Sequence, residues 1–88
     1  MNKQFTIEMC GDVNFEGMVI DISYNRETIA SINYEKGIDR IEIEVFPAQN
    51  EKFIFPIDDF VRVLEKARTL AVKCAKEDIE NRKKGIEY

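Results

Sequence analysis

The chain has 88 residues, 44% of them apolar, and a formal net charge of −4. This length fits a single domain over residues 1–88 with one modest core, and the apolar content excludes a disordered chain. Residues 1–55 carry ten acidic and five basic side chains, whereas residues 56–88 carry seven acidic and eight basic ones. Binding to a phosphate backbone needs clustered Lys and Arg, so we expect no nucleic-acid partner, and the acidic part permits a basic protein partner.

The sequence contains no apolar run long enough to cross a membrane and no charged-then-apolar leader. We therefore expect no membrane partner and a cytoplasmic location. The two cysteines, Cys10 and Cys74, are too few for a disulfide framework and lack the C-x-x-C spacing of a reactive pair. This favours two reduced thiols.

Four segments in the first part of the chain alternate apolar and polar residues, as half-buried strands do. They cover residues 3–9, 18–24, 28–34 and 40–46, and residues 53–55 can add a brief fifth strand. In the third segment Thr28, Ala30, Ile32 and Tyr34 are expected on the inner side. Because only short turns separate these segments, they are expected to pair as an antiparallel meander between residues 3 and 55.

The last third of the chain has the spacing of an amphipathic helix over residues 57–84. Its apolar residues recur at three- and four-residue intervals and form one face, namely Phe60, Val63, Leu64, Ala67, Leu70, Ala71 and Cys74, with Ile79 one turn further on. Pro56, Asp58 and Asp59 mark its start. A helix of this length, roughly 40 Å at about 1.5 Å per residue, is expected to overhang the strands. A two-helix dimer seam is the alternative use of the apolar face.

The expected fold is therefore α+β. A four- to five-stranded antiparallel meander sheet would carry one long C-terminal helix on one face and expose the other face to water.

The chain contains no histidine. This removes the commonest general base near neutral pH and the commonest imidazole metal ligand. No phosphate-binding Gly-rich loop is present either, so we expect no enzymatic activity, no cofactor and no metal. Asp58 and Asp59 are expected to serve the helix start, and metal binding is the alternative for this pair.

The alternation places four acidic side chains on the sheet face away from the helix. These are Glu8, Asp21, Glu42 and Glu44, and Val19, Ile29, Ser31, Asn33 and Phe46 project from the same side. Such a face can meet a positively charged partner, or it can serve solubility alone. We take Glu8, Asp21, Glu42, Glu44 and Phe46 as the candidate partner-binding residues. Phe15, in the loop over residues 10–17, either packs over the end of the sheet or forms an exposed anchor.

Two stretches, MVIDISYNRETIASINYEKGIDRIEIEVFP and FIFPIDDFVRVLEKARTL, resemble small bacterial immunity proteins encoded beside polymorphic or contact-dependent toxins. The resemblance covers roughly residues 18–70 and lies in acidic strands, tight turns and the F-x-[ILV]-D-[DE]-F helix start. It implies an inhibitor that blocks one cognate toxin by direct binding, often with an acidic surface against a basic nuclease. It transfers no site residues, because such interfaces differ between members.

We therefore expect a non-enzymatic binding protein, of which an immunity protein that occludes a basic toxin is one form. The alternative is a structural or assembly module that self-associates through its helix or a sheet edge. The expected oligomeric state is a monomer or a homodimer.

Overall fold

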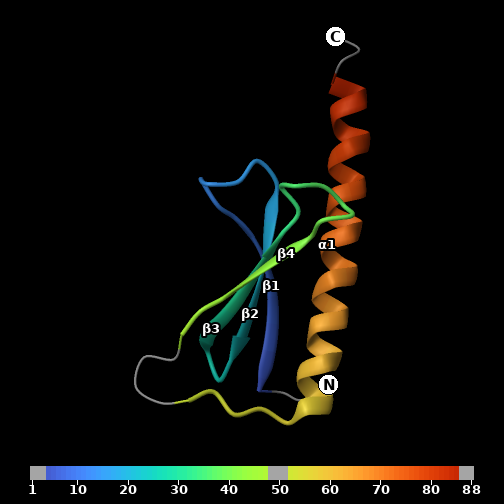
Figure 1. Cartoon of the computed structure of the whole chain (residues 1–88). Coiled ribbons are helices and arrows are strands. Elements are labelled where there is room, and N and C mark those ends of the chain that lie inside the picture. Colours follow the sequence, from blue (N-terminus) through green and yellow to red (C-terminus); the bar gives the residue numbers. More distant parts are fainter. Residues whose placement is uncertain (1–3, 48–51, 86–88) are drawn as a thin grey trace.

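The computed structural model describes residues 4–47 and 52–85, with side chains described as far as residue 80. Four strands, β1 (Phe5–Gly11), β2 (Met18–Tyr24), β3 (Glu27–Asn33) and β4 (Glu42–Val45), precede one helix, α1 (Ile57–Gly85). The strands form an antiparallel sheet in the order β1-β2-β3-β4, and α1 lies along one face of it (Figure 1). The predicted α+β meander is confirmed, while residue 3, the predicted start of the first strand, lies outside the described residues.

The core lies between α1 and the central strands. Ile20, Ile22 and Ile32 of the sheet and Val63 and Ala67 of the helix are each 4% exposed or less. Small side chains on the inner helix face allow the helix axis to approach the sheet closely, and Ala71 and Ala75 continue this face. The apolar stripe is thus packed on the sheet, as predicted, and its buried centre is not free to form a two-helix seam.

Residues 52–56 form no strand, so the optional fifth strand is absent from the described residues. Instead, the Phe55 ring lies among other aromatic rings at the end of the core nearest the helix start. Its centroid is 4.7 Å from that of Tyr24, 5.0 Å from Phe60 and 5.3 Å from Phe5. Pairs at these separations add to the free energy of apolar burial. This packing holds the segment before the helix without ladder hydrogen bonds.

The β2–β3 hairpin differs from the predicted strict alternation. Ile22 pairs with Ala30 but Ser23 pairs with Thr28, so Ile29 is an extra residue and forms a β-bulge. Thr28 therefore lies beside Ser23, with their hydroxyl oxygens 3.4 Å apart, and its predicted inward position is wrong. The bulge is the physical reason, because one inserted residue puts the alternation before it out of phase with the alternation after it, and Thr28 lies before Ile29.

A buried tyrosine ties three segments together at the other end of the sheet. The Tyr34 hydroxyl donates to Asp78 Oδ2 on α1 at 2.6 Å and accepts from the Met18 backbone N–H at 2.9 Å. Gly17 lies against the ring, because a Cβ at this position would come within 2.5 Å of Tyr34 Cε2. The contact fixes the helix against the start of β2.

Beyond this contact the helix extends past the sheet, as predicted (Figure 1). Its 29 residues give a length of about 43 Å. Ile79, one residue after Asp78, is 48% exposed. Within the described residues, no helix has the length and apolarity needed to cross a membrane.

The tight turn between β2 and β3 gives a test of backbone strain. Asn25 and Arg26 have φ of 49° and 71°, as a two-residue turn of the mirror-image type requires. Glycine adopts such angles without a steric cost, so Arg26→Gly should raise the free energy of unfolding by about 0.5–1 kcal/mol. Urea denaturation measures the change. Arg68→Gly on the exposed helix surface is the control and should lower the same quantity by a similar amount.

The tyrosine contact predicts a loss of stability at high pH. Burial, followed by the hydrogen bond to Asp78, raises the pKa of Tyr34 from 10.0 to about 12. The folded state therefore holds the phenol proton more tightly than the unfolded state, and its contribution is complete below pH 10 and is lost between about pH 10 and 12. Denaturation at several pH values between 10 and 12 measures how steeply the free energy of unfolding falls with pH.

Tyr34→Phe is the matched variant for this measurement. It should cost about 1–3 kcal/mol at neutral pH, because the Met18 N–H loses its acceptor. Its stability should also fall less steeply than that of the wild type above pH 10. If the free energy of unfolding falls equally steeply with pH in both proteins, the pKa of Tyr34 does not differ between the folded and unfolded states.

Candidate functional site

The register places three of the predicted acids in one row across the sheet. Glu8 pairs with Asp21, Asp21 with Ser31, and Ser31 with Glu44, so the row crosses all four strands. Residues directly opposite one another in an antiparallel sheet project from the same face. Ile22 and Ile32, which alternate with this row, are buried against α1, so the row lies on the far side. We call this side the acidic face.

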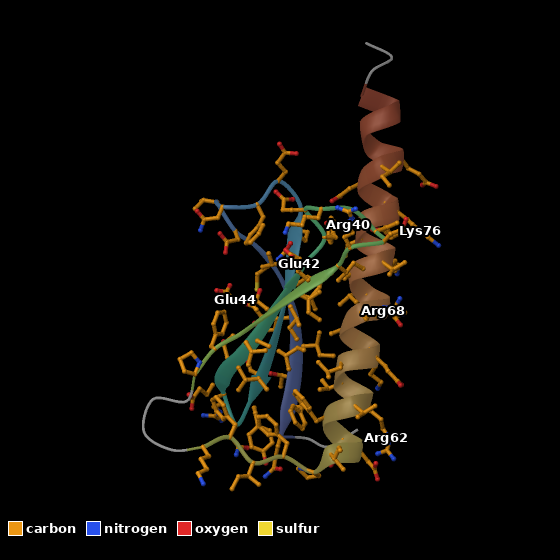
Figure 2. All side chains as sticks on the ribbon, in the orientation of Figure 1. Arg40, Glu42, Glu44, Arg62, Arg68 and Lys76 are labelled. Carbon is orange, nitrogen blue, oxygen red and sulfur yellow. The ribbon has the colours of Figure 1, made fainter. Side chains whose placement is uncertain are left out.

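Glu42 lies on the same face, in the next row, where it pairs with Asn33. Glu42 and Glu44 project away from α1, whereas Arg62, Arg68 and Lys76 project from the helix on the other side of the molecule (Figure 2). Glu8, Glu42 and Glu44 are exposed, and Asp21 is half-buried. The structure therefore brings the four predicted acids together on one face.

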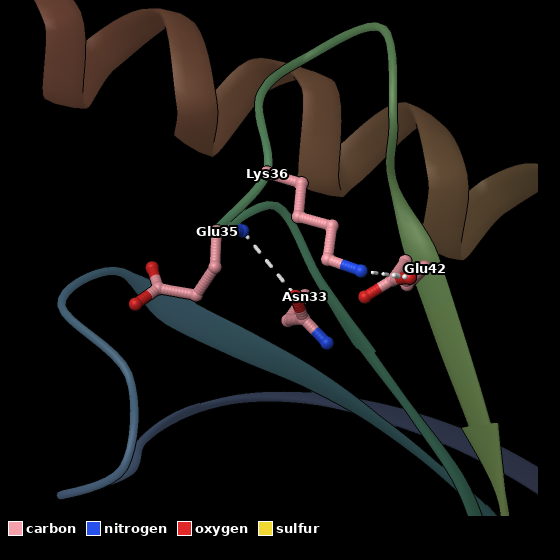
Figure 3. A network of polar contacts seen from close by, with 4 residues as sticks. All are labelled: Asn33, Glu35, Lys36 and Glu42. Atoms are coloured by element: carbon pink, nitrogen blue, oxygen red, sulfur yellow. Dashed lines mark hydrogen bonds and ion pairs between the residues drawn. The ribbon is translucent and has the colours of Figure 1, made fainter.

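A cation that the sequence pattern did not place lies at the edge of this face. Lys36 Nζ is 3.0 Å from Glu42 Oε2, and both side chains are more than half exposed (Figure 3). The Asn33 side-chain oxygen accepts from the Glu35 backbone N–H at 3.3 Å and helps to shape the turn that carries Lys36. An exposed ion pair contributes little to stability. It does offset the charge of Glu42, so Glu8, Asp21 and Glu44 carry most of the negative potential.

The apolar residues predicted on this face are less available than expected. Val19 and Ile29 are only 3% and 2% exposed, so the expectation that they interleave with the acids at the surface is wrong. Ile29 is the bulged residue, and its carbonyl accepts from the Phe46 N–H at 2.8 Å, which holds Phe46 beside it. Phe46 is half-buried. The acidic face therefore offers a polar surface, with Phe46 at its margin.

Cys10 lies on the acidic face, opposite Val19 and close to Asp21. Partial burial raises the pKa of the Cys10 thiol, and the nearby Asp21 and Glu8 carboxylates raise it further. Cys74 is buried on the helix, as predicted, and its Sγ lies 3.3 Å from Met9 Sδ. Both thiols are free, and neither environment favours the reactive thiolate.

The loop between β1 and β2 does not present Phe15 as an exposed anchor, since this ring is half-buried. The loop is held instead by backbone contacts. The Phe15 N–H donates to the Asp12 carbonyl at 3.0 Å, and the Glu16 N–H donates to Glu35 Oε1 at 2.9 Å. The fully exposed apolar residue of the loop is Val13, which alternation did not single out.

Asp58 and Asp59 lie in the first turn of α1, as predicted, and Asp59 forms an ion pair with Arg62 at 3.2 Å. Among the described residues, no three His, Cys, Asp or Glu side chains are grouped so as to hold a metal ion. The arrangement of the acidic face suits electrostatic recognition, because its carboxylates can accept hydrogen bonds from Lys or Arg of a partner.

The position of Cys10 gives a chemical test of the acidic face. Asp21→Asn removes one carboxylate beside the thiol, so the pKa of Cys10 should fall and its alkylation by iodoacetamide at neutral pH should become faster. Mass spectrometry of the peptide containing Cys10 measures the rate against pH. Glu80→Gln, on the distant part of α1, is the control and should leave the alkylation rate unchanged. An equal change of rate in both variants would show that the Asp21 carboxylate does not act on the Cys10 thiol.

The acidic face thus combines a row that crosses all four strands, with carboxylates on β1, β2 and β4 and Ser31 on β3, with a half-buried aromatic residue at its margin. This face is on the side of the sheet that the helix leaves open. No family model, curated protein or solved structure matches this chain.

Proposed function

We propose that the chain is a non-enzymatic, cytoplasmic binding protein that uses its acidic face to hold and occlude a basic protein, as an immunity protein does with a toxin. The row formed by Glu8, Asp21 and Glu44 is the observation that carries this proposal. Like charges at adjacent positions of a sheet oppose one another. A cationic partner surface would relieve this repulsion on binding.

The distribution of charge over the rest of the molecule also directs a basic partner to the acidic face. Between residues 62 and 76 the helix carries five basic side chains and one acidic side chain. A basic partner is therefore attracted to the acidic face and repelled from the middle of the helix. Such complementarity speeds association and selects the orientation more than it raises affinity.

Charge reversal tests this proposal. Glu8→Lys combined with Glu44→Lys should abolish capture of the partner from an extract of the native host, and a purified partner should bind at least about tenfold more weakly. Binding of the partner by the wild type should also weaken as salt is added. Both residues are exposed, so circular dichroism should show an unchanged fold.

The control for this experiment is Glu77→Lys combined with Glu80→Lys, which changes the net charge equally on the exposed part of α1. It should retain the partner. Equal capture by both double variants would remove the acidic face from the interface. A captured partner that is an enzyme should lose its activity at a stoichiometric amount of this chain, which tests occlusion separately from binding.

A second candidate function, self-assembly through a sheet edge, has one observation in its favour. β4 is an edge strand, and its residues Ile43 and Val45 are 44% and 69% exposed on the side that faces the helix layer. Val61, on α1, is also 44% exposed. Sedimentation of the isolated chain distinguishes the two candidates, because an assembly module forms dimers or larger species whose population rises with concentration.

A further inference from the structure

The opposite edge of the sheet carries a groove that the acidic face does not include. A cavity of about 610 Å³ lies between β1 and α1. Ile7 and Leu70 form its apolar part, and the remaining lining residues are polar or charged, namely Arg62, Glu65, Lys66, Thr69 and Lys73. We call this the β1 groove. Met9, on the same side of β1, is 52% exposed and continues the apolar strip.

The backbone of β1 is open along this groove. The sheet order leaves β1 without a neighbour on its outer side among the described strands. The Asn25 N–H donates to the Gln4 carbonyl at 2.9 Å, which fixes the phase of the β1–β2 ladder. Because hydrogen-bonded and non-hydrogen-bonded pairs alternate in an antiparallel sheet, Thr6 and Glu8 bond to β2. The N–H and C=O groups of Ile7 and Met9 then point outward.

The charges of the β1 groove select the chemistry of its occupant. Three of its lining residues are basic and one is acidic. Arg62 is paired with Asp59, whereas Lys66 and Lys73 form no ion pair with any other described residue. Two unpaired ammonium groups beside an apolar floor and an open strand edge suit an extended, acidic polypeptide segment.

We propose that the β1 groove binds an extended acidic segment of another protein, which adds to the sheet as a strand beside β1. Alternate side chains of that segment lie over the groove. Lys66 and Lys73 are two helical turns apart, about 10 Å, and four strand residues advance about 13 Å. The segment therefore carries two acidic residues four positions apart, with an apolar residue midway over Ile7 and Leu70.

The side chains of the bound segment that point to the other face lie beside Thr6 and Glu8. Like charges at such positions are destabilising, so these residues of the segment are neutral or basic. A second copy of this chain does not offer the acidic side chains that the β1 groove requires. Pairing of two β1 strands would bring the apolar side chains of β1, and no acidic ones, towards Lys66 and Lys73. It would also place both copies of Glu8 on the same face of the joined sheet.

The probe is a capped peptide as long as β1, Thr-Glu-Thr-Val-Thr-Glu-Thr, added to the full chain at low ionic strength. Its control has Lys in place of both Glu. Binding of the Glu peptide should slow amide hydrogen exchange at Ile7 and Met9 and leave Thr6 and Glu8, which already bond to β2, nearly unchanged. Binding without this protection would overturn the addition of a strand, and equal binding of the Lys peptide would overturn the charge selection.

Two variants test the groove itself. Lys66→Glu combined with Lys73→Glu should weaken binding of the Glu peptide on the order of tenfold. This double variant should bind the Lys peptide more tightly than the Glu peptide. Arg68→Glu combined with Lys76→Glu makes the same change of charge outside the groove and should leave the preference for the Glu peptide intact. The proposal fails if both double variants behave alike.

Met9→Pro removes one outward N–H while leaving the bonds between β1 and β2 in place, since proline is tolerated on an edge strand where its nitrogen faces solvent. It should weaken peptide binding in a chain that still folds, as checked by circular dichroism. If amide exchange at Ile7 and Met9 in the protein alone slows as its concentration rises, a second copy occupies the edge and the proposal is wrong.

Discussion

The contact between α1 and the central strands is the constraint on which the rest of the structure depends. It joins isoleucines of β2 and β3 to Val63, Ala67 and Ala71, all of them buried. At about 25 cal/mol per Å² of apolar surface, this burial is the main favourable term for a domain of this size. It also decides which sheet face is covered. Glu8, Glu42 and Glu44 of the acidic face are exposed because α1 lies on the opposite side of the sheet.

The two ends of this contact are held differently. At the helix start, the Phe55 ring packs with Phe5, Tyr24 and Phe60, so the contact there is between aromatic rings. At the other end, Tyr34 joins the helix to the start of β2 through two directional hydrogen bonds. Together they fix the position of the helix along the sheet, and this position sets where the β1 groove lies.

The molecule presents opposite charges on its two sides. The carboxylates of the acidic face and the basic middle of α1 are separated by the thickness of the sheet and the core (Figure 2). The two proposed sites are therefore electrostatically distinct. The proposed acidic face suits a basic surface, and the proposed β1 groove suits an acidic strand. The two sites adjoin at Glu8, which belongs to the acidic face and lies on β1.

The sequence alone determined the elements, because the two-residue period of the strands and the near-four-residue period of the helix are local properties of side-chain order. From this it followed that Glu8, Asp21, Glu42 and Glu44 share a face. Tertiary structure decided three features that the alternation of apolar and polar residues does not encode. The bulge at Ile29 is an insertion relative to a neighbouring strand, and the burial of Val19 depends on what packs around it. The β1 groove likewise exists only where the helix lies beside an open edge, since Ile7 and Leu70 are far apart in the chain and meet through packing alone.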